Sequence, residues 1–358
     1  MSSSASIAPP SSNKKEPPVL DAAKADRKLR GGLISLAVLV AIVVGLVLAV
    51  PGLHGVGKTV AHMNPDWIVI AVALELLSCL GYVFAFLQVF DEAPVRFGRR
   101  VALSELAFGA AVSLGGAGSV SIGALLLIER GAKPTRVAER SAVLFLLTSA
   151  INAGTLVLAG LLLFFGILPG PSNPLLGIIP AGVGIAAFII FLSLPRFVDR
   201  YLDKAPKRLR TLLSLTAESI RDTKAFLLHP DWRLLGAIAY LWCDIAVMVA
   251  CFAATGYNPP LVAIILAYQI GYLANAIPVP GSIGILDGSL IGMFVIYGIK
   301  ATPAAAATVV YHAIALFIPA AWGTLAFITL RRTRHKPLKL RPSFAERRRI
   351  KAREKEVA

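Results

Sequence analysis

The chain has 358 residues, of which 56% are hydrophobic and 16% charged, and its mean hydropathy is +0.73. These values exclude an ordinary soluble domain, and the long apolar runs predict an all-α polytopic membrane protein. The net charge of +16 is compatible with nucleic-acid binding, but the basic residues are segregated along the chain in a way that favours membrane topology instead.

Full-length membrane spans are expected in six segments. In chain order they are Leu33–Val50, Trp67–Phe90, Ala142–Phe165, Leu175–Leu194, Trp232–Thr255 and Pro303–Leu330. The first has an alternative as a cleaved signal peptide, because residues 47–49 resemble a small-residue cleavage site. Its long polar lead and Pro51 favour an uncleaved anchor. A transmembrane domain is thus expected over 33–330, between a disordered basic tail (1–32) and a second basic tail (331–358).

Two further apolar segments are interrupted. Residues 101–130 contain Gly-Gly-Ala-Gly-Ser at 115–119, and residues 261–298 contain Pro-Val-Pro-Gly at 278–281. A helix has to stop at such prolines, which donate no backbone hydrogen bond. Neither half of either segment is long enough to cross about 30 Å of hydrocarbon. We therefore expect two re-entrant pairs of half-helices.

The positions of the lysines and arginines along the chain indicate the membrane topology. All but two of the 36 lie in the tails and in the stretches 91–100, 130–140 and 195–233, which leaves Lys58 and Lys300 for the other face. Six spans and two re-entrant pairs reproduce this segregation, with both termini cytoplasmic in the cell membrane. The two broken pairs then enter from opposite sides, as in an inverted repeat with a site near the midplane; two independent irregular helices are the alternative. The connector 195–231 is expected to be cytoplasmic, with an amphipathic helix at 206–228.

Four acidic residues lie inside the apolar segments: Glu75, Glu105, Asp244 and Asp287. A charge at the bilayer centre costs at least about 2.5–3.5 kcal/mol, so each is expected to face a cavity, pair with a neighbour or hold a proton. For Asp287 and Glu105, in the broken segments, we favour head-group contact or proton coupling. For Glu75 and Asp244, hydrogen bonding between helices is an equal alternative. His312, in the last span, is either a packing residue or a partner of Asp287.

The remaining candidates surround the two breaks. Asn275 immediately precedes the second break, and Gly281 and Gly284 permit close backbone approach. Half-helices beginning near Ser119 and Ser282 would present free N–H groups suited to a phosphate, although both serines can equally be plain caps.

No soluble catalytic apparatus is evident in the sequence. It has no metal-ligand spacing and no Ser/His/Asp arrangement, and no lysine follows the glycine-rich run as in a nucleotide loop. Cys79, Cys243 and Cys251 fall within apolar spans and are expected to be reduced packing residues. We expect neither an enzyme nor a cofactor.

Near the C-terminal end the sequence resembles a known family. The resemblance rests on residues 277–287 (Ile-Pro-Val-Pro-Gly-Ser-Ile-Gly-Ile-Leu-Asp), 297–307 and 310–323. The glycine-broken region 109–131 is also similar. They resemble the lysylphosphatidylglycerol synthase transmembrane-region family of flippase-like membrane proteins. Three positions depart from its pattern: Ser282 stands for a frequent Gly, Asp287 for Glu and His312 for Arg.

The resemblance implies translocation of an anionic phospholipid or a polyprenyl-linked lipid between leaflets. The cytosolic aminoacyl-transferase domain of the best-known members is not expected, because residues 331–358 are too few to form it. Two alternatives remain open. One is a scaffold subunit for a separate lipid-modifying or glycosyl-transferase enzyme, and the other is an ion-coupled small-solute transporter.

Overall fold

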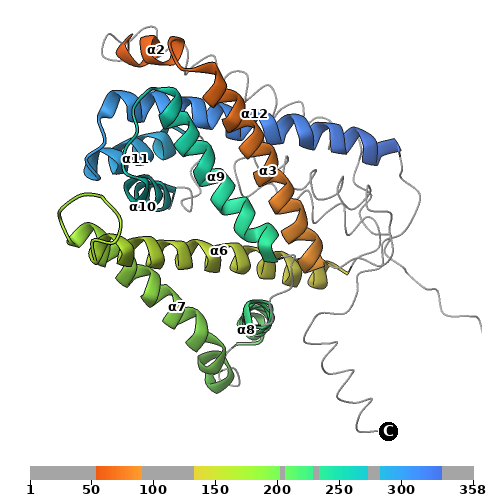
Figure 1. Cartoon of the computed structure of the whole chain (residues 1–358). Coiled ribbons are helices and arrows are strands. Elements are labelled where there is room, and N and C mark those ends of the chain that lie inside the picture. Colours follow the sequence, from red (N-terminus) through yellow and green to blue (C-terminus); the bar gives the residue numbers. More distant parts are fainter. Residues whose placement is uncertain (1–53, 91–132, 202–205, 229–233, 273–282, 333–358) are drawn as a thin grey trace, which may run out of the picture.

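The computed structural model describes residues 54–90, 133–201, 206–228, 234–272 and 283–332. These ranges form a helical bundle without strands (Figure 1). Its helices are α2 (His54–Ala61), α3 (Pro65–Phe90), α6 (Pro134–Phe164), α7 (Leu175–Tyr201), α8 (Lys207–Leu228), α9 (Leu234–Ala254), α10 (Leu261–Tyr272), α11 (Ile283–Ile296) and α12 (Ala301–Arg332). Five of them, α3, α6, α7, α9 and α12, are long and apolar enough to cross a membrane. The predicted all-α polytopic fold is confirmed.

The five described spans correspond to five of the predicted ones, but two of the helices extend well beyond the predicted segments. Helix α6 begins at Pro134, eight residues before Ala142, because proline is well tolerated in the first turn, where its missing N–H has no helical partner. Helix α7 continues past Leu194 through Pro195 to Tyr201. The predicted span at 33–50 and the broken segment 101–130, with Glu105 and Ser119, lie outside the described residues.

The bundle has two distinguishable ends. At one, the backbone N–H of Asn64 donates to the carbonyl of Ala254 at 2.9 Å, which joins the start of α3 to the end of α9, and α2 packs against α12 near Thr302. We call this the α2 end. At the other, the α8 end, α8 packs against α6 and α7. Lys58 and Lys300 both lie at the α2 end. The distribution of lysine and arginine along the sequence predicted that these two residues share one face of the membrane.

Helices α10 and α11 form a pair of short helices. They have 12 and 14 residues, or about 18 and 21 Å at 1.5 Å per residue, less than a bilayer core. Helix α10 follows the end of α9 and α11 precedes the start of α12, so the pair begins and finishes at the α2 end. The Ser289 hydroxyl donates to the Gly271 carbonyl at 3.0 Å. Two short halves are therefore present as predicted, while the break itself, 273–282 with Asn275, Gly281 and Ser282, lies outside the described residues.

Helix α8 is the amphipathic helix expected at 206–228. Its apolar and small polar face is buried against α6 and α7, and includes Ala217, Ser219, Ile220 and Thr223. The Ser219 hydroxyl donates to the backbone carbonyl of Glu139 at 3.4 Å. An exposed ion pair, Arg221 with Asp199 at 2.5 Å, also connects α8 to α7. The helix is thus docked on the bundle.

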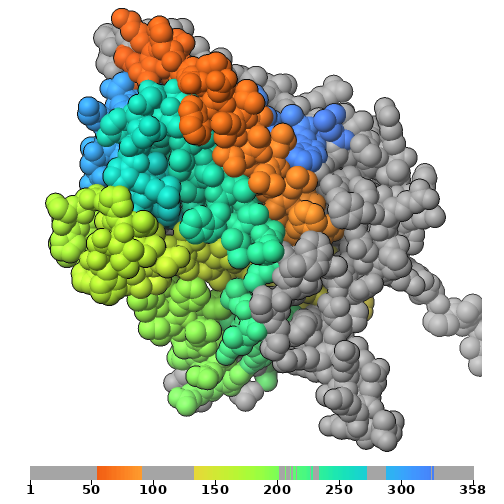
Figure 2. All heavy atoms as spheres, viewed as in Figure 1, coloured from red at the N-terminus to blue at the C-terminus, as the bar shows by residue number. Residues whose placement is uncertain are grey.

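The five spans differ in how much of each faces outward. In α7, 22% of the apolar stretch is buried, against 39–50% in the other four. Its exposed side chains include Ile179, Val183, Ile189 and Ile190. Helix α7 (green) lies at the lower left edge of the molecule in Figure 2. Helix α7 therefore offers the most surface to lipid, while α9, α10, α11 and α12 enclose the main apolar core.

Candidate functional site

Polar side chains from four helices meet inside the apolar core. Glu75 lies ten residues after the first residue of α3, and Asp244 ten residues before the last residue of α9. Because these two helix ends are joined at the α2 end, both carboxyls lie about 15 Å along their helices, near the middle of a core about 30 Å thick. Tyr311 is likewise ten residues after the first residue of α12.

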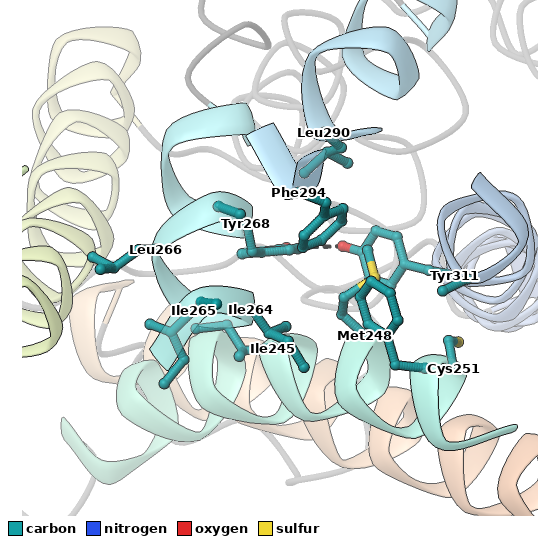
Figure 3. Close-up of a cluster of buried hydrophobic side chains, with 14 of the residues drawn as sticks. Ile245, Met248, Cys251, Ile264, Ile265, Leu266, Tyr268, Leu290, Phe294 and Tyr311 are labelled. Atoms are coloured by element: carbon teal, nitrogen blue, oxygen red, sulfur yellow. Dashed lines mark hydrogen bonds between the residues drawn. The ribbon is translucent and has the colours of Figure 1, made fainter. Parts of the chain in front are cut away.

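The Asp244 carboxyl is the centre of this polar cluster. It accepts hydrogen bonds from both tyrosines: from Tyr268 on α10 at Oδ2, and from Tyr311 on α12 at Oδ1 at 2.9 Å. The two tyrosine oxygens are themselves 2.8 Å apart. Figure 3 shows both tyrosines pointing toward one another among Met248, Phe294 and other core side chains. The tyrosines are 2% and 1% exposed, so Asp244 is bonded by side chains that water does not reach.

Glu75 adds a second carboxyl from α3. It is 2% exposed and interacts electrostatically with Asp244. Its Oε1 lies 3.8 Å from the Cys79 sulfur, a weak hydrogen bond, and its Oε2 has no hydrogen-bond partner among the described residues. His312 completes the cluster from α12: it interacts electrostatically with Asp244, and its ring centroid is 5.2 Å from that of Tyr311.

The cluster is not equally buried on all sides. Asp244 and His312 each keep part of their surface exposed, whereas Glu75 and the two tyrosines do not. Both ring nitrogens of His312 are nevertheless buried, so the exposed part of its surface does not include them. Within the described ranges, no group of three or more His, Cys, Asp or Glu side chains could hold a metal ion.

The packing of α3 on α9 holds the two carboxyls at this depth. The Ser78 hydroxyl donates to the Tyr240 carbonyl at 2.8 Å, and Gly81 and Gly236 face one another where the helices cross. A Cβ on Gly81 would lie 2.6 Å from the Tyr240 nitrogen and 2.7 Å from the Gly236 carbonyl oxygen. Glycine is required here because the two backbones touch, as in other close membrane-helix contacts.

Three of the predicted site residues belong to this cluster: Glu75, Asp244 and His312. Tyr268 and Tyr311 are functional candidates that the sequence analysis missed. The backbone of Asp287 and Gly284 lies in α11, but their side-chain surroundings fall outside the described residues, as does everything about Glu105, Ser119, Asn275, Gly281 and Ser282. The suggested pairing of His312 with Asp287 stays a prediction, and among the described residues His312 interacts with the carboxyl of Asp244.

Cys79, Cys243 and Cys251 form no disulfide among the described residues. Cys79 and Cys251 are buried, and Cys243 is partly exposed beside Asp244. All three lie within described membrane-spanning helices, as predicted, and their reduced state stays a prediction.

Removal of the Tyr311 hydroxyl is expected to destabilise the protein. In Tyr311→Phe, Asp244 Oδ1 loses its donor, and a buried acceptor left unsatisfied costs about 1–3 kcal/mol. Thermal unfolding in detergent should show a lower midpoint for Tyr311→Phe than for Tyr257→Phe. Tyr257 is the matched control because it lies partly exposed at the α2 end, with its ring 5.8 Å from the Lys300 ammonium. Equal midpoints would mean that the hydroxyl–carboxyl bond contributes nothing.

Comparison with known proteins adds two findings. A family model described as the lysylphosphatidylglycerol synthase TM region matches residues 32–323. A UPF0104 membrane protein of Methanothermobacter thermautotrophicus is 37% identical over 90 residues, which are 25% of this chain and 26% of that protein. The alignment thus spans about a quarter of the length of the curated relative.

Proposed function

Because the chain belongs to the lysylphosphatidylglycerol synthase transmembrane-region family, we propose that it moves a phospholipid or lipid-linked head group between the two leaflets of a membrane. The observation that carries the proposal is the polar cluster of Asp244, Tyr268 and Tyr311 at the middle of an apolar bundle. A buried charged group lowers the stability of the fold unless it is paired. Ionisable side chains at this depth in a membrane protein therefore indicate a functional site.

The physical role of the cluster is to divide a long apolar crossing into two shorter ones. A head group that leaves one surface gives up its water and regains hydrogen bonds only at the far surface, about 30 Å away. Asp244 and the tyrosine hydroxyls offer hydrogen-bonding partners about halfway, because they lie about 15 Å along their helices. Acyl chains would stay in the bilayer beside outward-facing spans such as α7 while the head group passes inside.

The negative charge of the carboxyls affects which lipid head groups the cluster can bind. Two carboxyls favour a head group that carries hydroxyl or ammonium donors over a bare phosphate. A lipid phosphate would be bound elsewhere, and the predicted sites for it are the half-helix starts near Ser119 and Ser282. We propose no chemical step: lipid enters and leaves unchanged. We also propose the cell membrane as the location, with both termini in the cytoplasm.

The proposal is tested by reconstitution. The purified chain is placed in vesicles that contain a trace of head-group-labelled phosphatidylglycerol, phosphatidylethanolamine or polyprenyl phosphate, and a membrane-impermeant quencher is added outside. Transport predicts that quenching proceeds beyond the outer-leaflet half of the label for at least one lipid. Quenching that stops at that half for every lipid, as in protein-free vesicles, contradicts the proposal.

A scaffold role is the second candidate, and the surface of α8 favours it. Arg210 and Lys224 are exposed on this docked helix, which suits an acidic partner surface such as that of a lipid-modifying enzyme. Deleting residues 331–358 separates the two functions. Lipid movement should survive the deletion if the chain transports lipid, whereas co-purification of an enzyme should be lost if the basic tail recruits it.

A further inference from the structure

We propose that Asp244, Tyr268, Tyr311 and Glu75 form a proton-binding site, and that the proton bound there is coupled to the lipid movement proposed above. The coupling rests on that proposed function. The binding site rests on the arrangement of the side chains alone.

The first argument comes from counting hydrogens. The Asp244 carboxyl and the hydroxyls of Tyr268 and Tyr311 make three oxygen–oxygen contacts. Each tyrosine contacts Asp244, and the two tyrosine oxygens are 2.8 Å apart. Each contact needs one hydrogen, but two tyrosine hydroxyls bring only two. With Asp244 ionised, both hydrogens point at its carboxylate, and the contact between the tyrosine oxygens has none.

One added proton supplies the missing hydrogen, so that each of the three contacts has one. If Asp244 carries it, the carboxyl donates to one tyrosine, that tyrosine donates to the other, and the second tyrosine donates back to the remaining carboxyl oxygen. All three contacts are then hydrogen bonds in a closed ring. Loading forms one O–H bond on Asp244 and removes one negative charge from the bundle, and release to water breaks that bond and restores the charge.

Glu75 supplies the second, independent argument. Its side chain is more than nine-tenths buried, its Oε2 has no hydrogen-bond partner among the described residues, and it interacts electrostatically with Asp244. Two ionised carboxylates in an apolar bundle repel each other and have both lost their hydration. The Glu75–Asp244 pair therefore holds at least one proton, and the partly exposed Asp244 is the member placed to exchange it.

The other titratable groups around this pair lie on α3, α9, α10 and α12. The described lysines and arginines lie in α2, in α8 or near helix ends, and the charged residues of α6 are confined to its first turns at the α8 end. His312 is the base that interacts with Asp244. The titratable side chains within α3, α9, α10 and α12 beside the pair are Cys79, Tyr82, Tyr240, Cys243, Cys251, Tyr268, Tyr311 and His312.

Infrared spectroscopy of the reconstituted full chain tests the site without any assay of transport. A protonated carboxyl has a carbonyl stretch distinct from that of a carboxylate, and it can be followed while the pH is raised. The wild type should show such a band that disappears as the pH rises. All Asp and Glu side chains contribute to this band as they titrate, so the site is identified from difference spectra between the wild type and each variant. Asp244→Asn should remove a component of the band at pH values where exposed carboxyls are already ionised. Asp66→Asn, which removes an exposed carboxylate at the start of α3, should leave that component unchanged. Glu75→Gln should alter it, because the two carboxyls share one environment.

The coupling is tested in the same vesicles with a transmembrane pH gradient. One proton per lipid predicts that a gradient of one pH unit drives an asymmetry of about tenfold between the leaflets, in the presence or absence of sodium. A pH-dependent carboxyl band without lipid movement would overturn the transport function and leave the site standing. Lipid movement by a wild type in which Asp244→Asn removes no component of the carboxyl band would overturn the site and leave the transport function standing. An asymmetry that follows sodium instead of protons, or no asymmetry under a pH gradient, would overturn the coupling and leave both the site and the transport function standing.

Discussion

Asp244→Asn is expected to lower the initial rate of lipid translocation at least about tenfold. Asparagine keeps the shape of the side chain but never carries its charge, so the charge-assisted bonds from Tyr268 and Tyr311 are lost. A hydrogen bond to a charged group contributes about 1.5–3 kcal/mol, and each 1.4 kcal/mol corresponds to about a tenfold change. The measurement is the initial rate of quenching of labelled lipid in proteoliposomes, at equal protein content.

The matched control for this variant is Asp199→Asn. Asp199 is also an aspartate on a membrane-spanning helix, but it lies exposed at the α8 end, paired with Arg221. Exposed pairs contribute about 0–1 kcal/mol, so this change should leave the rate close to that of the wild type. A wild-type rate in a correctly folded Asp244→Asn variant would remove Asp244 from the mechanism.

Gly81→Ala is expected to destabilise the bundle by about 1–3 kcal/mol, the usual cost of overpacking. The new methyl group would lie 2.6 Å from the Tyr240 nitrogen and 2.7 Å from the Gly236 carbonyl oxygen. Both are backbone atoms, so no side-chain rotation can relieve the contact, and α3 and α9 have to separate. The midpoint of thermal unfolding in detergent should fall, and transport should fall with it because the carboxyl pair spans this interface.

Gly182→Ala provides the comparison for Gly81→Ala. Gly182 lies inside α7, and a Cβ there meets nothing within 4 Å. Alanine is favoured over glycine within a helix by about 0.5–1 kcal/mol, so this variant should be as stable as the wild type or slightly more so. Equal unfolding midpoints for the two alanine variants would show that the α3–α9 contact is looser than described.

The fold was largely predictable because membrane spans are a property of composition and length. Hydropathy alone located α3, α6, α7, α9 and α12, and the prolines of the second break separated α10 from α11. The helix ends were less predictable. A proline can open a helix, as at Pro134, or be accommodated inside one, as at Pro195, and local sequence does not distinguish the two.

The cluster was only half predictable, for a related reason. Glu75, Asp244 and His312 attract attention because ionisable groups are costly in an apolar span. Tyrosine in such a span looks like an ordinary packing residue. One signal could have identified Tyr311: it lies ten residues into its helix, at the same depth as Glu75 and Asp244. The resemblance to the lysylphosphatidylglycerol synthase transmembrane-region family is confirmed by the match over residues 32–323. The roles of Asp287 and Glu105 stay predictions.

The most direct test of the central claim is photocrosslinking with a phospholipid that carries its reactive group on the head group. Adducts are located by mass spectrometry after illumination of the reconstituted protein, and a second probe with the reactive group on the acyl chain marks the lipid-facing surface. We expect head-group adducts around Asp244 and His312, and acyl-chain adducts on α7 around Ile189 and Ile190. Head-group adducts confined to the helix ends, with none near Asp244 or His312, would contradict passage of the head group through the cluster.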